Sequence, residues 1–234
     1  MGEAMTYETR RSEIETYFDR TAAETWKKLT STAPVGRVRA SVRAGRDAMR
    51  ETLLSYLPAD LGGCRLLDAG CGTGALAMEA ARRGAEVVAV DLSPTLTGHA
   101  AELAAAEGLG DRISFVAGDM LDERFGRFDH VVMMDSLIHY EPADAVMTLS
   151  RLAGRTERSL VVTFAPKTPL LAAMHRVGKL FPRADRSPAI VPVAKARLLE
   201  AISREPALVA FRPGRDARVD TGFYKSHALE LRRA

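Results

Sequence analysis

The chain has 234 residues, of which 47% are apolar, so it is long enough to fold around a full hydrophobic core without disulfide bonds. Its net charge of +3 and pI near 9.0 are mildly basic, which does not require nucleic acid but suits an acidic ligand or an anionic surface. No apolar run approaches the roughly 20 residues of a membrane span, residues 1–20 show no signal-peptide pattern, and Cys64 and Cys71 form no Cys-x-x-Cys motif, so we expect a cytoplasmic protein with reduced thiols.

The hydrophobic pattern predicts helices and strands in turn. Two N-terminal helices, over 8–30 and 35–57, precede the first strand. The elements that follow are strand 64–69, helix 74–83, strand 86–91, a helix over 94–107 that Ser93 caps and Pro94 opens, strand 113–117, strand 128–135, helix 142–154, strand 159–165, helix 193–204 and two final runs, 207–218 and 222–232. Strands that alternate with helices indicate a parallel sheet covered on both faces. The predicted fold class is therefore α/β, a Rossmann-like seven-stranded sheet that is mostly parallel and ends in an antiparallel C-terminal hairpin.

A glycine-rich turn joins the first strand to its helix. Residues 68–74 read Asp-Ala-Gly-Cys-Gly-Thr-Gly, and glycine allows positive φ and close approach of a ligand to the backbone. The spacing Gly70-x-Gly72-x-x-Ala75 matches the dinucleotide-binding fingerprint. However, a carboxylate at Asp68 would repel a pyrophosphate and attract a cation. The turn therefore favours a cationic ligand, and the dinucleotide interpretation stays as a weaker alternative.

The pattern Asp-x-Gly-x-Gly-x-Gly resembles the first motif of class I S-adenosylmethionine-dependent methyltransferases. A carboxylate that ends the second strand, Asp91, is placed to accept both ribose hydroxyls. In the methyltransferases, an acid after the third strand lies against the adenine, and residues after the fourth strand lie near the transferred methyl. The resemblance thus implies S-adenosyl-L-methionine as co-substrate, contacted by Tyr17, Asp68, Gly70, Cys71, Gly72, Gly74, Asp91, Leu92, Asp119, Met120, Asp135 and Ser136.

More particular strings narrow the acceptor. They are Tyr-Phe-Asp-Arg at 17–20, Leu-Ile-His-Tyr at 137–140 and Phe-Ala-Pro-Lys-Thr at 164–168. Together they closely resemble magnesium-protoporphyrin IX O-methyltransferases of chlorophyll and bacteriochlorophyll synthesis, over roughly residues 13–230. That family methylates one propionate of the magnesium porphyrin. The resemblance implies Tyr17 and His139 as the catalytic pair, with Tyr17 capping the cofactor and His139 holding the propionate. It further implies substrate contacts from Arg39, His139, Tyr140, Lys167 and His175, and no metal ion held by the protein.

The chemistry of the acceptor decides what His139 would do. Methyl transfer from a sulfonium is an in-line displacement, for which the enzyme mainly supplies alignment and exclusion of water. A carboxylate with a pKa near 4 is already ionised at neutral pH, so His139 would orient it. With a phenol or amine acceptor, His139 could serve as a general base. A histidine with a purely structural role is the simpler alternative.

The sequence suggests three parts: an N-terminal helical cap over 1–60, a methyltransferase core over 61–165 and 193–234, and a lid insertion over 166–192 that binds substrate. The insertion is also compatible with an ordinary amphipathic helix or an interfacial helix. Arginines at 39, 43, 46 and 50 share one helical face, which is either solvated or uses Arg39 first to hold a propionate.

Other functions remain open at this point. One is a methyltransferase for a small phenolic or quinone-type acceptor, and another is a porphyrin carrier without catalysis. The resemblance to the porphyrin enzymes also implies delivery of the substrate by a magnesium chelatase subunit and peripheral contact with the photosynthetic membrane. No nucleic-acid partner is expected. The sequence leaves open which propionate reacts, whether the porphyrin magnesium takes a protein ligand, and the oligomeric state.

Overall fold

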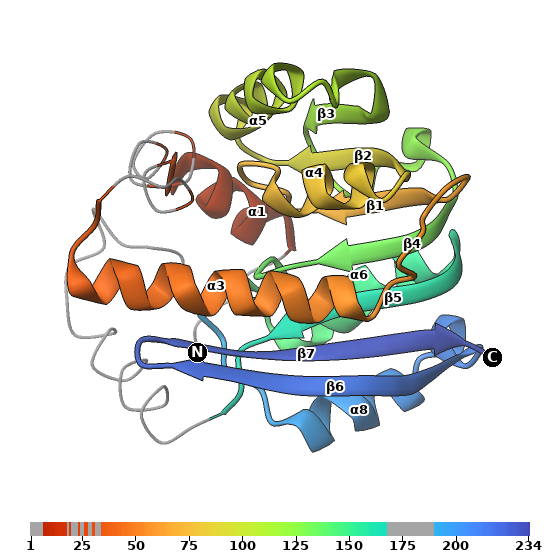
Figure 1. Cartoon of the computed structure of the whole chain (residues 1–234). Coiled ribbons are helices and arrows are strands. Elements are labelled where there is room, and N and C mark those ends of the chain that lie inside the picture. The colour runs from red at the N-terminus through yellow and green to blue at the C-terminus, as the bar shows by residue number, and fades with distance from the viewer. Residues whose placement is uncertain are drawn as a thin grey trace.

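The chain folds around one mixed sheet with helices on both faces (Figure 1). The structure is a computed structural model that describes residues 7–17, 19, 23, 26, 27, 30, 34–167 and 190–234. Its elements are α1 (Tyr7–Thr16), α3 (Arg37–Ser55), β1 (Arg65–Ala69), α4 (Ala75–Arg82), β2 (Glu86–Asp91), α5 (Pro94–Ala106), β3 (Ile113–Ala117), β4 (Phe128–Met133), α6 (Pro142–Ala153), β5 (Thr156–Phe164), α8 (Lys195–Ser203), β6 (Phe211–Thr221) and β7 (Tyr224–Arg233).

The sheet has seven strands in the order β3-β2-β1-β4-β5-β7-β6. Strands β1 to β5 are parallel, whereas β7 runs antiparallel between β5 and β6. The predicted seven-stranded, mostly parallel sheet with an antiparallel hairpin is therefore confirmed. Because the parallel strands point the same way, the segments that follow each of them meet at one edge of the sheet, where ligands bind in open α/β folds.

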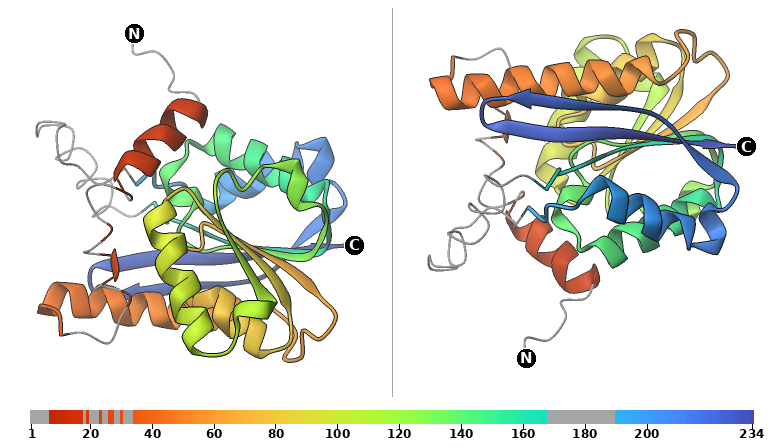
Figure 2. Two further views of the ribbon diagram at one scale, coloured as in Figure 1. Left: turned by 90° about the horizontal axis from the view of Figure 1, so that it is seen from above. Right: turned by 90° about the horizontal axis from the view of Figure 1, so that it is seen from below.

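The core consists of two layers, one on each face of the sheet. Successive residues of β4 show the division, since Val131 and Met133 pack in one apolar cluster and Val132 packs in the other. Helices α6 and α8 cover one face, and α3 and α4 cover the other (Figure 2). Burial on both faces explains why the strands read as nearly continuous apolar runs. Among the helices that the structure describes, none has both the length and the apolar character needed to cross a membrane.

Several element boundaries differ from the predicted ones. The first helix ends at Thr16 instead of extending to residue 30, and part of the remaining stretch lies outside the described residues. Strand β4 ends at Met133 instead of 135, because Asp135 has φ 55° and donates its N–H to the Thr163 side chain. The hairpin begins at residue 211 because Pro206–Leu208 form a short 3₁₀ turn. The predicted cap at Ser93 is confirmed, since its hydroxyl accepts from Leu96 N at 3.2 Å. Most of the predicted lid lies outside the described residues.

Helix α3 lies along the C-terminal hairpin, so segments far apart in the sequence pack side by side (Figure 1). The Ser41 hydroxyl donates to Thr221 O at 2.7 Å. One helical turn further, Gly45 allows very close contact: a Cβ there would lie 2.2 Å from Thr221 Oγ1 and 2.5 Å from Tyr224 Cδ1. The helix therefore packs against the hairpin where Gly45 has no side chain.

We predict that Gly45→Ala destabilises the protein. The added methyl group would push α3 away from the hairpin, and overpacking of this kind costs about 1–3 kcal/mol, which exceeds the gain in helix propensity of about 1 kcal/mol. Urea unfolding measures the change. Gly98→Ala in α5 is the matched control, because a Cβ there meets nothing within 4 Å. A Gly45→Ala protein as stable as Gly98→Ala would show that the close contact does not exist.

Candidate active site

A cavity of about 410 Å³ lies at the carboxyl ends of the parallel strands. It is lined by a residue that ends or follows each of β1 to β5, namely Gly70, Asp91, Gly118, Asp135 and Ala165. Helices α1 and α3 and the turn of the β6–β7 hairpin supply further walls. Of the predicted site residues, Tyr17, Gly70, Gly72, Asp91, Leu92, Asp119, Met120, Asp135, Ser136, His139 and Tyr140 line this cavity.

All three glycines of the loop after β1 have positive φ and allow close approach of a neighbour, and two of them, Gly70 and Gly72, also line the cavity. Gly70 has φ 88°, and a Cβ there would lie 2.0 Å from Ser136 Oγ. Gly72 has φ 54°, and a Cβ there would lie 3.2 Å from Nε1 of Trp26. The Asp91 carboxylate accepts from the N–H groups of Gly72 and Ser93, at 2.9 and 3.0 Å. Asp91 therefore fixes the loop and still borders the cavity.

Asp68 is a buried acid without a full set of partners. Its side chain is 1% exposed, and Oδ2 has no hydrogen-bond partner among the described residues. Burial, and secondarily repulsion from Asp91, raises the pKa of Asp68 to about 7. Asp68 borders a small second cavity of about 40 Å³ together with Cys71 and Thr73. A cationic group placed there would satisfy Oδ2 and favour the ionised carboxylate. Burial likewise raises the pKa of the Cys71 thiol, so this cysteine is not an activated nucleophile.

Asp119 connects the cavity to helix α1. Its two oxygens accept from Tyr7 OH at 2.9 Å and from Arg11 Nη1 at 2.8 Å. The Tyr7 ring stacks on Tyr140, with centroids 5.2 Å apart and an interplanar angle of 18°. Helix α1 is thereby held over the cavity beside the predicted adenine position. The sequence analysis did not identify Tyr7 or Arg11, because no local pattern links them to an acid so far along the chain.

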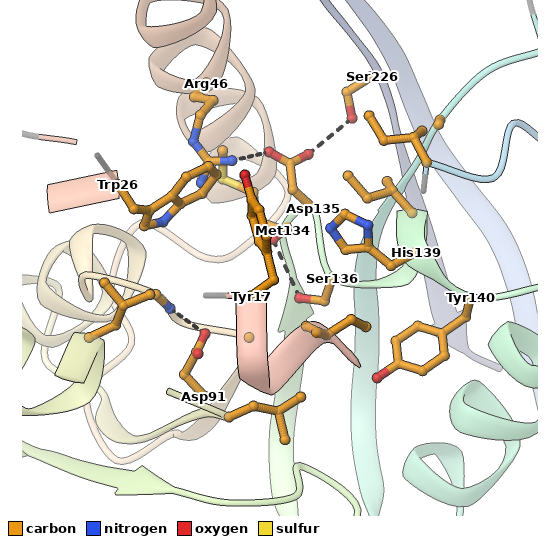
Figure 3. A pocket seen from close by; sticks show the side chains of 18 of the residues that line it. Tyr17, Trp26, Arg46, Asp91, Met134, Asp135, Ser136, His139, Tyr140 and Ser226 are labelled. Carbon is orange, nitrogen blue, oxygen red and sulfur yellow. Dashed lines mark hydrogen bonds and ion pairs between the residues drawn. The ribbon is translucent and has the colours of Figure 1, made fainter. Parts of the chain in front are cut away.

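Asp135 is the centre of a buried polar network. Its carboxylate, 8% exposed, pairs with Arg46 Nη1 at 2.5 Å, and Tyr224 OH donates to it at 3.0 Å. The Arg46 guanidinium lies over the Trp26 ring, 4.6 Å from the centroid. Figure 3 shows Arg46 facing Asp135 beside Trp26. The network joins α3, the end of β4 and the hairpin. The sequence assigned Asp135 to the cofactor, but its carboxylate is already bound by Arg46 and Tyr224.

Tyr17 and His139, the predicted catalytic pair, both line the cavity (Figure 3). His139 ends a short 3₁₀ turn, Leu137–His139, and is 7% exposed. The hydroxyl of Ser136 donates to Ala69 O at 2.6 Å, which ties this turn to the end of β1. The turn after β4 thus holds His139 in the wall of the cavity, at the carboxyl edge of the sheet.

Three predicted residues lie elsewhere, and a fourth is outside the described residues. Arg39 is exposed and does not line the cavity, because it lies two turns, about 10 Å, before Arg46 along α3. Lys167 is exposed and also lies outside the cavity lining. Gly74 instead begins helix α4, with φ 77°. His175 lies outside the described residues. Within the described ranges, His, Cys, Asp and Glu side chains form no group of three that could hold a metal ion.

Comparison with known proteins agrees with this geometry. Residues 133–233 match the family model "Magnesium-protoporphyrin IX methyltransferase C-terminus", and residues 66–157 match a methyltransferase domain. The chain is 48% identical to a magnesium-protoporphyrin O-methyltransferase of Rhodobacter capsulatus, over 97% of this chain and 98% of that protein. It is 30% identical to the protein of the same name in Synechocystis, over 94% and 95% of the two chains. The crystal structure of magnesium protoporphyrin IX methyltransferase from Synechocystis PCC 6803 with bound SAH superimposes with a TM-score of 0.84 at 28% identity, covering 96% of this chain and 100% of that one.

We predict that Arg46→Met destabilises the protein by about 3 kcal/mol, because removal of one partner leaves the other charge buried. Urea unfolding measures the loss. The double variant with Asp135→Asn should recover much of it, since the uncompensated charge is then gone. Additive losses in the two single variants and the double variant would show that Arg46 and Asp135 are not energetically coupled.

Proposed function

The chain belongs to the magnesium-protoporphyrin O-methyltransferase family, and from this we propose that it methylates one propionate carboxylate of magnesium protoporphyrin IX. The methyl donor is S-adenosyl-L-methionine, and the products are the monomethyl ester and S-adenosylhomocysteine. The observation that supports this most directly is a cavity that joins two different environments. One end carries the glycine loop and buried acids, and the other carries His139 within apolar walls.

The first end of the cavity suits the cofactor. In the small adjoining cavity, which shares Gly70 with the main one, Oδ2 of Asp68 is a buried acceptor without a partner among the described residues, and a cationic group of the cofactor would supply one. The glycine loop would lie against the methionine part, Asp91 would accept from the ribose, and Asp119 with Met120 would lie against the adenine. When bound, the cofactor supplies an activated methyl group on a positively charged sulfur. The acids at this end also favour that charge.

The second end suits an ionised, largely apolar acceptor. Its walls include Ile138, Ala165, Ile190 and Phe223, which fit a flat macrocycle. A propionate is already a carboxylate at neutral pH, so no group needs to remove a proton. His139 would hold the carboxylate oxygen, and Tyr17 would cap the cofactor and align the methyl with that oxygen. Helix α1 and the turn after β4 would keep water away from the reacting atoms.

Further properties follow from the family resemblance and remain predictions. They are delivery of the porphyrin by a magnesium chelatase subunit, substrate binding by the insertion over 166–192, and peripheral contact with a membrane. The alternative is a methyltransferase that acts on a small phenolic or quinone-type acceptor, which could use the same fold and cofactor. The activity assay below distinguishes the two acceptors.

We predict that the purified protein transfers a methyl group from S-adenosylmethionine to magnesium protoporphyrin IX, seen by mass spectrometry as the monomethyl ester. A phenolic acceptor should give no product. His139→Ala should lower turnover by about a hundredfold, as expected for loss of a positioned catalytic group, without a change in affinity for S-adenosylhomocysteine. If the porphyrin gains no methyl group although S-adenosylhomocysteine still binds, then magnesium protoporphyrin IX is not the acceptor. Equal loss of turnover and cofactor affinity in the variant would make His139 structural.

The raised pKa of Asp68 predicts that cofactor affinity depends on pH. Below its pKa of about 7 the buried side chain is protonated, so a cationic ligand must first displace that proton. Affinity for S-adenosylhomocysteine, which keeps its ammonium group, should therefore fall by about tenfold per pH unit as the pH drops below 7. Titration calorimetry at several pH values measures this slope. Asp68→Asn cannot titrate at this position, so an equally steep slope in that variant would contradict the assignment.

A further inference from the structure

The outer end of the cavity has an apolar rim that the transfer reaction does not use. Phe223 is 67% exposed and Ile190 is 40% exposed, and both line the cavity. Phe223 follows Gly222 in the turn between β6 and β7, a position that usually carries a polar residue or glycine. Because Phe223 and Ile190 both line the cavity, these two exposed apolar side chains form one surface that a ligand in the cavity could cover.

The hairpin turn is fixed in place, so this ring has a defined position. The Phe223 N–H donates to Ser41 Oγ at 3.4 Å, and Ser41 Oγ donates to Thr221 O at 2.7 Å. Gly222 has φ 59°, and a Cβ there would lie 2.8 Å from Ser41 Oγ. The turn therefore rests directly on α3. Phe223 is presented by two packed elements and not by a free loop.

A cation that shares its carboxylate partner with a second cation lies beside this rim. Of the described lysines and arginines, Arg46 and Lys225 line the cavity. Arg46 is neutralised by the buried carboxylate of Asp135. Lys225 pairs with Asp220, which also pairs with Arg218 at 2.9 Å, so two cations share one carboxylate. An ammonium has three donors, and the Lys225 side chain is 16% exposed. It can therefore bind a second anion at the rim.

We propose that Lys225 binds the propionate that is not methylated, while Phe223 packs against the face of the macrocycle. This inference rests on the proposed function. Protoporphyrin carries two propionates on neighbouring pyrrole rings, and only one can lie beside His139 and the methyl donor. The other keeps its negative charge throughout the reaction and needs a cation. Holding it at Lys225 fixes the macrocycle in one orientation and thereby decides which propionate receives the methyl group.

A series of three ligands tests this assignment: magnesium protoporphyrin IX, its enzymatic monomethyl ester and its dimethyl ester. Binding is measured with S-adenosylhomocysteine present, through quenching of the fluorescence of Trp26, the single tryptophan of the chain. Lys225→Met should weaken binding of the diacid and the monoester by about tenfold, the effect of one lost charge-assisted hydrogen bond. It should leave binding of the dimethyl ester unchanged, because that ligand has no free carboxylate. Phe223→Ala should weaken all three ligands alike.

Two matched variants complete the experiment. Lys225→Arg should keep the selectivity for a free carboxylate. Arg212→Met removes a charge from the far end of the same hairpin, at an exposed residue that does not line the cavity, and it should leave the three affinities in their original order and size. The proposal would be overturned if Lys225→Met weakened binding of the dimethyl ester as much as binding of the diacid. It would also be overturned if Lys225→Met left the affinity for the monomethyl ester unchanged. Both results are distinct from failure of the proposed function, which is scored separately by methyl transfer in the wild-type protein.

Discussion

The cavity depends on one buried interaction, the pairing of Asp135 with Arg46 and Tyr224. These residues come from the end of β4, from α3 and from the start of β7, three segments far apart in the sequence. Asp135 is the only residue other than glycine with positive φ among the described residues. Backbone strain of this kind persists when the surroundings hold it firmly, and it is concentrated at functional sites. Here Asp135 is the strained residue, and it connects α3 to the C-terminal hairpin, both of which line the cavity.

The same interaction separates the charges of the site. Arg46 is engaged by Asp135 and lies over Trp26, beside the glycine loop. It therefore borders the glycine loop without adding a net positive charge there, which suits the proposed cationic cofactor. By contrast, Asp68 and Asp91 are buried acids, and burial raises the pKa of each. Burying them together is unfavourable in the protein alone. A bound cation would offset that cost, which favours the proposed cationic cofactor over a dinucleotide.

The sequence predicts the fold well, because the relevant signals are local. Strands β1 to β3, the cap at Ser93 and the glycine turn follow from apolar runs and turn residues that are neighbours in the chain. The sequence also indicates which residues end each strand, since parallel strands bring those ends to one edge. It does not indicate Tyr7 beside Asp119 or Tyr224 beside Asp135. Tertiary packing makes those contacts, because Tyr7 and Asp119 are 112 positions apart in the chain and Tyr224 and Asp135 are 89 positions apart. The arginine face of α3 is visible as a pattern, but only the tertiary position of α3 determines that Arg46, and not Arg39 two turns earlier, reaches the cavity.

A carboxylate acceptor explains why so much of the site serves positioning. An ionised oxygen is already a nucleophile, and the sulfonium is already an activated donor, so the remaining barrier is largely one of approach and desolvation. Positioning requires fixed points at both ends of the reacting pair. The cofactor end is fixed by a loop that Asp91 binds through backbone N–H groups. The acceptor end is fixed by a hairpin turn that Ser41 holds against α3. Both are connected through the Asp135 network, so a shift of α3 moves the two ends relative to each other. The packing of α3 on the C-terminal hairpin therefore sets the relative positions of the two fixed points that the proposed reaction requires, at a distance from the reacting atoms.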